Sequence, residues 1–314
     1  VPGAAAEVVL STPVACVPGE TCWVQNLVDV DPGPEATDFR CSGFTYDGHS
    51  GTDFRIENAA AMARGVAVLA PAPGRVLRVR DGEPDRRFGP QEDGTGTDSG
   101  RECGNGIVID HGGGVETQFC HLKRGSVAVT PGEQVERGTP LGLVGASGQT
   151  AFVHVHMTVR RDGKTVDPFT GRTVGDGACG PGGEPMFEDA ELLLGSIEAR
   201  VVNAGFAVGA VEMDAIEDGS LPPPSIGRDA PALVFYGRAA NLRDGDRQRI
   251  VIRGPRFTVE RTGEPLPRKQ AQSMIFAGRR APEGGLDPGI YVGRYEVLRE
   301  GRILDAAAVT LVLE

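Results

Sequence analysis

The residues best suited to chemistry in this chain of 314 residues are its histidines, because a neutral imidazole can bind a metal or carry a proton. There are five of them: His49, His111, His121, His154 and His156. All five lie between Phe44 and Phe169, and the C-terminal half of the chain has none. Their concentration in one segment is the first indication of a metal site there.

Two of these histidines, His154 and His156, stand two residues apart in the strand-like run 151–159. Side chains at positions i and i+2 of a strand point to the same face, roughly 6.6 Å apart along it. One imidazole can therefore bind a metal while the other lies beside it. The alternative is a partly exposed strand that carries two histidines by chance.

A second chemical element is the glycine-broken segment 48–53, in which His49 and Asp53 stand four residues apart. Both side chains can reach one cation if the chain curls, although such a pair alone is more typical of a polar turn. His121, at the end of a predicted hairpin strand, is the third element. Two histidines and one carboxylate make a three-ligand zinc site with its fourth position free for water, which is typical of catalytic zinc.

The composition disfavours several classes of partner. The chain has 32 Lys and Arg against 43 Asp and Glu, a formal net charge of −11, whereas nucleic-acid binding requires a basic surface. The same charge disfavours simple electrostatic adhesion to anionic membranes or wall polymers. No run approaches the roughly 18 apolar residues of a membrane-spanning helix, so we expect no membrane span.

The six cysteines indicate the compartment. Their even number and the lack of paired CxxC motifs favour disulfides over a zinc ribbon. The chain begins at Val1 without a charged and then apolar segment, as expected if a signal peptide has been removed, so we expect an exported, periplasmic or extracellular protein. We favour Cys16–Cys22 across a Pro-Gly turn and Cys103–Cys120 between neighbouring strands, with Cys41–Cys179 remaining, while other pairings stay open.

Abundant glycine (46) and proline (23) predict many short strands joined by turns, so the expected fold class is mainly β. A hairpin turn is expected at residues 112–114. Strands are expected over residues 66–69, 75–80, 106–110, 115–120 and 153–160, and then over 232–236, 249–253, 256–260, 290–298 and 308–313. The second group has the spacing of a small immunoglobulin-like β-sandwich.

The predicted organisation has four parts: a disulfide-tied, irregular N-terminal arm (1–40), a compact antiparallel β-sheet domain (41–184), a linker (185–222) and the small sandwich (223–314). We expect one short helix over residues 187–200. A polar, glycine-rich insertion over residues 81–101 has no periodicity, and loops of this length often border active sites.

Five sequence blocks, in their order and spacing, resemble the LytM/lysostaphin-type zinc metallopeptidases, a family of bacterial cell-wall endopeptidases. They are HSGTD, VLAPAPGRV, CGNGIVIDHGGGVETQFCHL, PGEQVERGTPLGLVGASG and HVH, and they cover about residues 44–169. The resemblance implies a compact antiparallel β peptidase domain with a groove over the metal. It also implies that His49, Asp53 and His156 bind Zn²⁺, and that His121 and His154 serve catalysis.

The implied reaction is hydrolysis of peptide bonds in peptidoglycan stems or crosslinks by metal-activated water. Since no Glu stands in an HExxH arrangement, the proton transfers fall to His154 and His121. Phe119, where relatives often have tyrosine, and the long 81–101 insertion bear on groove shape rather than on the metal. We interpret His111, at the start of the hairpin turn, as structural.

Two other functions stay open. A LytM-like domain can be a non-catalytic activator of another wall hydrolase, although such proteins have lost metal ligands and all the positions are filled here. The chain can also be a secreted protease that acts on protein substrates. The C-terminal module lacks histidine, cysteine and an aromatic platform, so we expect it to dock a protein regulator or pack on the catalytic domain, and we expect the N-terminal arm to line or block the groove.

Overall fold

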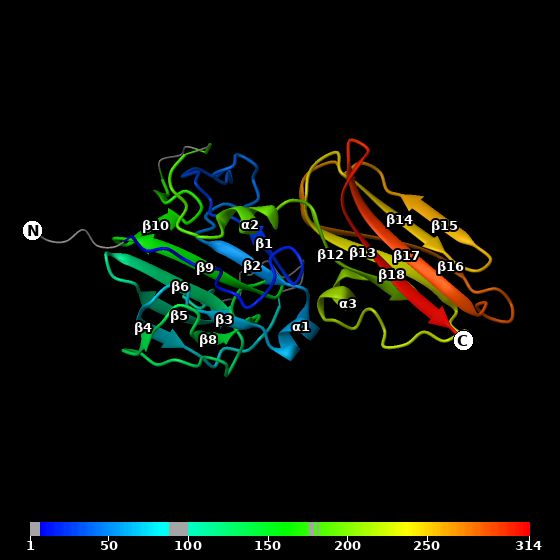
Figure 1. The fold of residues 1–314 in the computed structure, drawn as a ribbon, viewed down its shortest axis with the longest axis horizontal. Coiled ribbons are helices and arrows are strands. Elements are labelled where there is room, and N and C mark those ends of the chain that lie inside the picture. Colours follow the sequence, from blue (N-terminus) through cyan, green and yellow to red (C-terminus); the bar gives the residue numbers. More distant parts are fainter. Residues whose placement is uncertain (1–6, 88–99, 176–178, 181) are drawn as a thin grey trace, which may run out of the picture. The chain divides into compact units, whose positions relative to one another are not determined.

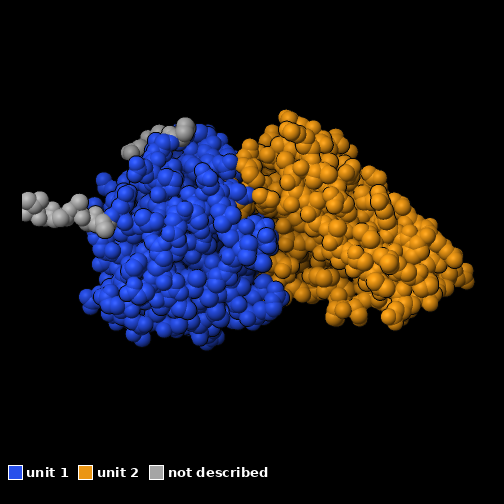
Figure 2. All heavy atoms as spheres, viewed as in Figure 1, with its two compact units in different colours: residues 1–56, 61–195 blue, residues 57–60, 196–314 orange. Residues whose placement is uncertain are grey.

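The chain divides into two compact units, and Figure 1 labels most of its helices and strands. Unit 1 comprises residues 1–56 and 61–195, and unit 2 comprises residues 57–60 and 196–314 (Figure 2). The domain boundaries expected from the sequence stay predictions.

The computed structural model describes residues 7–87, 100–175, 179–180 and 182–314. Residues 88–99 of the expected 81–101 insertion lie outside the described residues. The predicted mainly β, antiparallel fold class is confirmed. No helix in the described part of the chain is long and apolar enough to cross a membrane.

Unit 1 is built on a nine-stranded sheet with the order β1-β2-β9-β6-β5-β4-β7, in which β10 also pairs with β9 and β11 pairs with β10. Its strands are β1 (Cys22–Asn26), β2 (Thr52–Ile56), β4 (Gly74–Arg80), β5 (Asn105–Asp110), β6 (Val115–Leu122), β7 (Gln134–Val135), β9 (His154–Arg161), β10 (Lys164–Asp167) and β11 (Arg172–Thr173). A two-stranded sheet pairs β3 (Ala67–Leu69) with β8 (Pro140–Leu143). The short helix α1 (Ala59–Arg64) precedes β3 in the chain, and the short helix α2 (Ala190–Gly195) follows β11.

The β5–β6 hairpin follows from alternation and turn chemistry. Burial alternates along the first half of β6, the period of two that a strand requires. The three glycines between the strands, at 112–114, all have positive φ, a region that glycine enters without a Cβ clash. Val115 N donates to the carbonyl of Gly112 at 3.0 Å and closes the turn. The predicted hairpin is therefore confirmed, and each strand expected from the sequence is present with shifted ends.

The expectation of an irregular segment over residues 1–40 is wrong at β1, which is an edge strand of the large sheet. Its five residues are almost all buried, so it lacks the alternation of a half-exposed strand. The helix expected over 187–200 is also too long, because α2 ends at Gly195, a poor helix former, and a strand begins at Arg200.

All three disulfides match the favoured pairing: Cys16–Cys22, Cys41–Cys179 and Cys103–Cys120. The described residues contain no free cysteine. Cys103–Cys120 links the segment that precedes β5 to β6. β5 and β6 are the two strands of the hairpin. Disulfides persist in oxidising compartments, so these bonds are consistent with the expected export.

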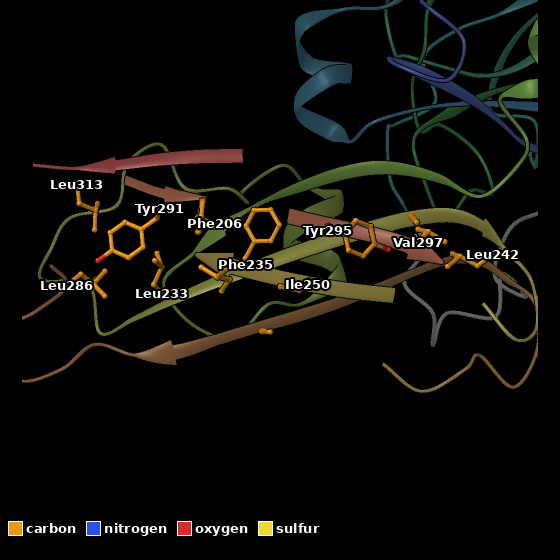
Figure 3. Close-up of a cluster of buried hydrophobic side chains, with 14 of the residues drawn as sticks. Phe206, Leu233, Phe235, Leu242, Ile250, Leu286, Tyr291, Tyr295, Val297 and Leu313 are labelled. Atoms are coloured by element: carbon orange, nitrogen blue, oxygen red, sulfur yellow. The ribbon is translucent and has the colours of Figure 1, made fainter. Parts of the chain in front are cut away.

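Unit 2 contains a three-stranded sheet, β12-β13-β16, and a four-stranded sheet, β15-β14-β17-β18. Its elements are β12 (Arg200–Ala207), α3 (Met213–Glu217), β13 (Ala232–Leu242), β14 (Arg247–Arg253), β15 (Thr258–Thr262), β16 (Gln270–Arg280), β17 (Gly289–Arg299) and β18 (Arg302–Leu313). One buried cluster takes Phe206 and Phe235 from the first sheet and Ile250, Tyr291 and Tyr295 from the second (Figure 3). The two sheets therefore pack face to face as a β-sandwich, and its immunoglobulin-like character stays a prediction.

Asp167, at the end of β10, is a buried carboxylic acid near Asp38. Its Oδ1 accepts hydrogen bonds from Phe169 N at 3.0 Å and Thr170 Oγ1 at 3.1 Å. Its Oδ2 has no hydrogen-bond partner among the described residues. Burial raises the pKa of Asp167 to about 6, against the lowering effect of its hydrogen bonds.

This shift predicts a pH-dependent stability. The folded pKa of Asp167 lies above the unfolded value, so the contribution of Asp167 to the free energy of unfolding is greatest below about pH 4 and is lost as the pH rises through about 6. Between pH 4 and pH 7 we expect the free energy of unfolding of the wild type to fall by up to about 3 kcal/mol more than that of the Asp167→Asn variant. One pKa unit is worth about 1.4 kcal/mol. Urea unfolding of both proteins at both pH values measures the difference, and identical pH dependence would contradict the explanation.

Candidate metal centre

A row of directly opposed residues crosses four neighbouring strands. Asn26 of β1 lies opposite Asp53 of β2, and Asp53 lies opposite His156 of β9. On its other side, His156 lies opposite Cys120 of β6. Directly opposed residues of antiparallel strands share a face, so the register of the sheet brings together groups that are distant in sequence.

His49, Asp53 and His156 converge on one point. His49 Nε2 and His156 Nδ1 lie 3.1 Å and 2.9 Å from Asp53 Oδ1, and the two nitrogens lie 3.1 Å apart. Tetrahedral zinc with bonds of about 2.0–2.1 Å holds its donor atoms roughly 3.3 Å apart, so this spacing fits such an ion. The three residues form the candidate metal group among the described residues. Their role as ligands, expected from the sequence, stays a prediction.

Hydrogen bonds on the outer side of each side chain determine which atom faces the cluster. His49 Nδ1 lies 2.6 Å from the carbonyl oxygen of Leu27, which can only accept, so Nδ1 carries the proton and the lone pair of Nε2 points inward. His156 Nε2 lies 3.0 Å from Thr158 Oγ1, which turns Nδ1 toward Asp53. Metal-binding imidazoles usually have such outer partners, so this arrangement also fits a metal site.

The charges in the cluster suit a cation. Burial raises the pKa of Asp53, but the facing His49 and His154 rings outweigh burial and hold it well below its usual range. Burial lowers the pKa of His49, but Asp53 outweighs it and leaves that pKa raised. The pKa of His156 stays lowered by burial. At neutral pH Asp53 is therefore ionised and His156 is neutral, the states that bind metal.

His121 lies beside this cluster as a neutral base. Its ring centroid is 4.7 Å from that of His154 and 6.2 Å from that of His156. His121 Nδ1 lies 2.8 Å from the carbonyl oxygen of Ser147 and so carries the proton. Burial holds the pKa of His121 well below its usual range, so the ring is neutral and Nε2 is a proton acceptor.

His154 lies between His121 and the cluster. Its Nε2 is 3.4 Å from Asp53 Oδ1, and its Nδ1 is 3.0 Å from the carbonyl oxygen of Phe152. The Phe152 ring stacks on the imidazole with centroids 4.3 Å apart. The structure thus brings both predicted catalytic histidines next to the predicted ligands, and their roles stay predictions.

His111 makes different contacts. Its Nδ1 lies 2.9 Å from the carbonyl oxygen of Pro73, and its Nε2 lies 2.8 Å from Thr117 Oγ1. Both ring nitrogens are therefore used in hydrogen bonds to the protein, which fits the structural interpretation.

Sequence reasoning missed several residues that contact the site. The Tyr46 ring lies 4.5 Å from the His49 ring, centroid to centroid, with more than half of Tyr46 exposed. Asn26 Nδ2 donates to Asp53 Oδ2 at 2.8 Å, and Ser147 and Leu27 contribute the carbonyls described above. Tyr46 lies next to the His49 motif and could have been found there. Ser147 lies in the block 131–148 quoted for the resemblance, but its backbone carbonyl carries no signal of its own, and Asn26 and Leu27 lie outside all five blocks.

Gly51 stands between the two N-terminal ligands and has no room for a side chain. A Cβ at this position would lie 2.5 Å from His156 Nε2 and 2.6 Å from the carbonyl oxygen of Met157. Glycine therefore allows the backbone to pass directly against the His156 ring.

The comparison with known families agrees with this geometry. The pattern of Peptidase family M23 matches residues 47–168, a segment that contains all five histidines. Residues 47–168 are a Peptidase family M23 domain. The resemblance to the LytM/lysostaphin-type peptidases that the sequence indicated is therefore confirmed.

Curated relatives match parts of this chain. The DD-carboxypeptidase/endopeptidase Mpg of Neisseria meningitidis serogroup B is 37% identical over 80 residues, which are 25% of this chain and 18% of the relative. Peptidoglycan DD-endopeptidase ShyB of Vibrio cholerae is 29% identical over 119 residues, which are 38% of this chain and 22% of the relative. The chain thus spans about a fifth of the length of these relatives.

Solved structures are similar to this chain over about half of it. A zinc containing peptidase from Vibrio cholerae is 25% identical and covers 47% of this chain and 39% of its own, with a TM-score of 0.29. The catalytic domain of the antimicrobial peptidase lysostaphin from Staphylococcus simulans is 20% identical and covers 45% of this chain and 85% of its own, with a TM-score of 0.28.

The close approach at Gly51 predicts that Gly51→Ala weakens zinc binding. The added methyl group must displace the His156 ring, so we expect the zinc dissociation constant to rise roughly tenfold or more, as for loss of an outer partner of a ligand. Competition with a chromogenic chelator measures it. Gly195→Ala is the matched control, because a Cβ there meets no atom within 4 Å. Unchanged zinc affinity in Gly51→Ala would contradict the role given to this contact.

Proposed function

We propose that this chain is a zinc-dependent endopeptidase that hydrolyses peptide bonds in peptidoglycan stems or crosslinks. The observation that carries the proposal is the convergence of His49 Nε2, Asp53 Oδ1 and His156 Nδ1 within 3.1 Å, inside an M23 domain. The names of the relatives, a DD-carboxypeptidase/endopeptidase and a peptidoglycan DD-endopeptidase, support the substrate class.

We propose that His49, Asp53 and His156 hold the metal through these atoms. Imidazole and carboxylate donors also suit other transition ions, but two histidines with one carboxylate are a common set in catalytic zinc sites. When bound there, zinc supplies Lewis acidity and activates a water molecule near neutral pH.

In this proposal His121 and His154 carry out the proton transfers. His121 is neutral with Nδ1 protonated, so its Nε2 accepts a proton from the attacking water and passes it to the leaving amine. His154 Nδ1 faces the Phe152 carbonyl and so carries the proton, which leaves Nε2 as an acceptor that orients the water and shares in the proton transfer. The stacked Phe152 ring and the Phe152 carbonyl limit rotation of His154, so its position is fixed before substrate binds.

Features outside the metal centre support proposals about the cellular location of the protein and about its binding partners. Three disulfides support export to the periplasm or the cell exterior. The net charge of −11 disfavours wall binding through charge, so we propose that substrate is recognised by shape and specific contacts. Residues 223–314 contain no histidine or cysteine, and we propose that this module docks a protein regulator.

Two alternatives make different predictions. A non-catalytic activator of another wall hydrolase does not need an intact catalytic set, whereas His49, Asp53, His121, His154 and His156 are all present and clustered. A secreted protease for protein substrates would use the same chemistry, so only substrate assays separate it from a wall hydrolase.

Digestion of purified peptidoglycan by the full chain tests the proposal. We expect wild type to release peptide-cleaved fragments, and His121→Ala and His154→Ala to lower turnover about a hundredfold or more while zinc stays bound, because each removes a proton-transfer group. His156→Ala is expected to lose zinc as well as activity. Chromatography of the fragments and elemental analysis of the protein give the two readouts.

His111→Ala is the matched control, since it removes an imidazole whose contacts lie elsewhere, and it should keep zinc and most of the turnover. Zinc retained in His156→Ala but lost in His154→Ala would reverse the assignment within the HVH motif. Zinc-loaded wild type that releases no fragments, yet accelerates another wall hydrolase, would support the activator. Cleavage of proteins but not of peptidoglycan would support the protease.

A further inference from the structure

The segment 22–30 lies upstream of the M23 match, yet it contacts two of the three candidate ligands. Its β1 strand pairs with β2, and Asn26 is placed directly opposite Asp53 by a register shift after Val24. The metal site thus extends beyond the part of the chain that the family pattern describes.

Asn26 determines how the Asp53 carboxylate is turned. Its Nδ2 donates a hydrogen bond to Asp53 Oδ2 at 2.8 Å, while the other oxygen, Oδ1, faces His49 and His156 at 3.1 Å and 2.9 Å. Because Asp53 is only 1% exposed, bulk water cannot replace this donor. Without Asn26 the carboxylate would lose its outer hydrogen bond and the restraint on its rotation.

The residues that follow Asn26 hold the second ligand. The Leu27 carbonyl accepts the hydrogen bond from His49 Nδ1 at 2.6 Å and so fixes the ring and its tautomer. Asp29 N donates to the His49 carbonyl at 2.8 Å, and Asp29 Oδ2 accepts from Gly48 N at 3.0 Å. One short segment therefore orients both His49 and Asp53.

This segment is a fixed part of unit 1. Trp23, Val24, Leu27 and Val28 are each at most 2% exposed, so the segment contributes to the core. The Cys16–Cys22 disulfide constrains the chain immediately before β1. A strand held in this way is ready to orient ligands in the folded protein and is unsuited to act as a detachable cover.

We infer that Asn26 is a positioning residue of the metal site, acting on the metal through Asp53. The inference rests on the proposed zinc site and extends the chain's metal-binding apparatus to a residue outside the M23 segment. Loss of an outer partner of a metal ligand typically weakens metal binding by about 10- to 100-fold. We expect that loss in Asn26→Leu, which keeps the approximate size of the side chain and removes its donor.

The test compares zinc binding by wild type, Asn26→Leu and Val24→Ala, all as the full chain. Chelator competition gives the zinc dissociation constant, and the rise in melting temperature on adding zinc gives a second measure. The absorption spectrum of the cobalt-loaded protein reports ligand geometry. Val24→Ala is the control for damage to β1, because Val24 is a buried core residue of the same strand. We expect it to lower the melting temperature of apo and zinc-loaded protein alike, with zinc affinity unchanged within about threefold.

The outcomes of these measurements decide whether Asn26 positions Asp53 for the metal. Weaker zinc binding and an altered cobalt spectrum in Asn26→Leu, with Val24→Ala unaffected in both, support the inference. Zinc affinity of Asn26→Leu within about threefold of wild type overturns it, and so does equal weakening in Val24→Ala. Faster peptidoglycan digestion by Asn26→Leu would overturn it in favour of a segment that blocks the site. If the wild type binds zinc but does not digest peptidoglycan, the proposed function alone is contradicted. If the wild type binds no zinc, the proposed function and the inference about Asn26 are both contradicted.

Discussion

The negative charge of Asp53 is the constraint around which unit 1 is arranged. A carboxylate that is almost fully withdrawn from water is costly unless hydrogen bonds and opposite charges surround it. Here Asn26 satisfies one oxygen, while nitrogens of His49, His156 and His154 lie 2.9–3.4 Å from the other. Apart from protons, a small cation is the group that best completes such an arrangement, because it attracts the carboxylate and the imidazole lone pairs together.

Strand register makes this arrangement possible. Because side chains alternate along a strand, a slip of one residue between β2 and β9 would turn His156 to the opposite face from Asp53. Every residue of β2 is buried, as are five of the eight residues of β9. Any other register would therefore also move buried side chains of these strands out of their packing positions. The apolar core and the polar cluster therefore specify the same pairing, and the geometry of the site follows from the stability of the sheet.

Much of this site can be predicted from one sequence because its chemistry is local. His49 with Asp53, and His154 with His156, stand in short motifs, and the alternating strands around them are visible in the residue pattern. Asn26 and Leu27 carry no such signal, since an ordinary asparagine and a backbone carbonyl gain their roles only through the β1–β2 register. The same limit applies to β1, whose complete burial removes the alternation that identifies a strand. Gly51 stands inside a motif, but its closeness to His156 depends on a contact between residues more than a hundred positions apart.

The wide separation of the candidate ligands along the chain constrains the order of events in maturation. His49 and His156 are 107 positions apart, and Asp53 and His156 are 103 apart, yet β2 and β9 are immediate neighbours in the sheet. A chain in which this large loop is still open offers at most a two-donor fragment, so metal uptake must follow its closure. Once captured, the ion links β9 to β2 and to the loop before β2, so it constrains segments that are far apart in the chain, much as a covalent crosslink would.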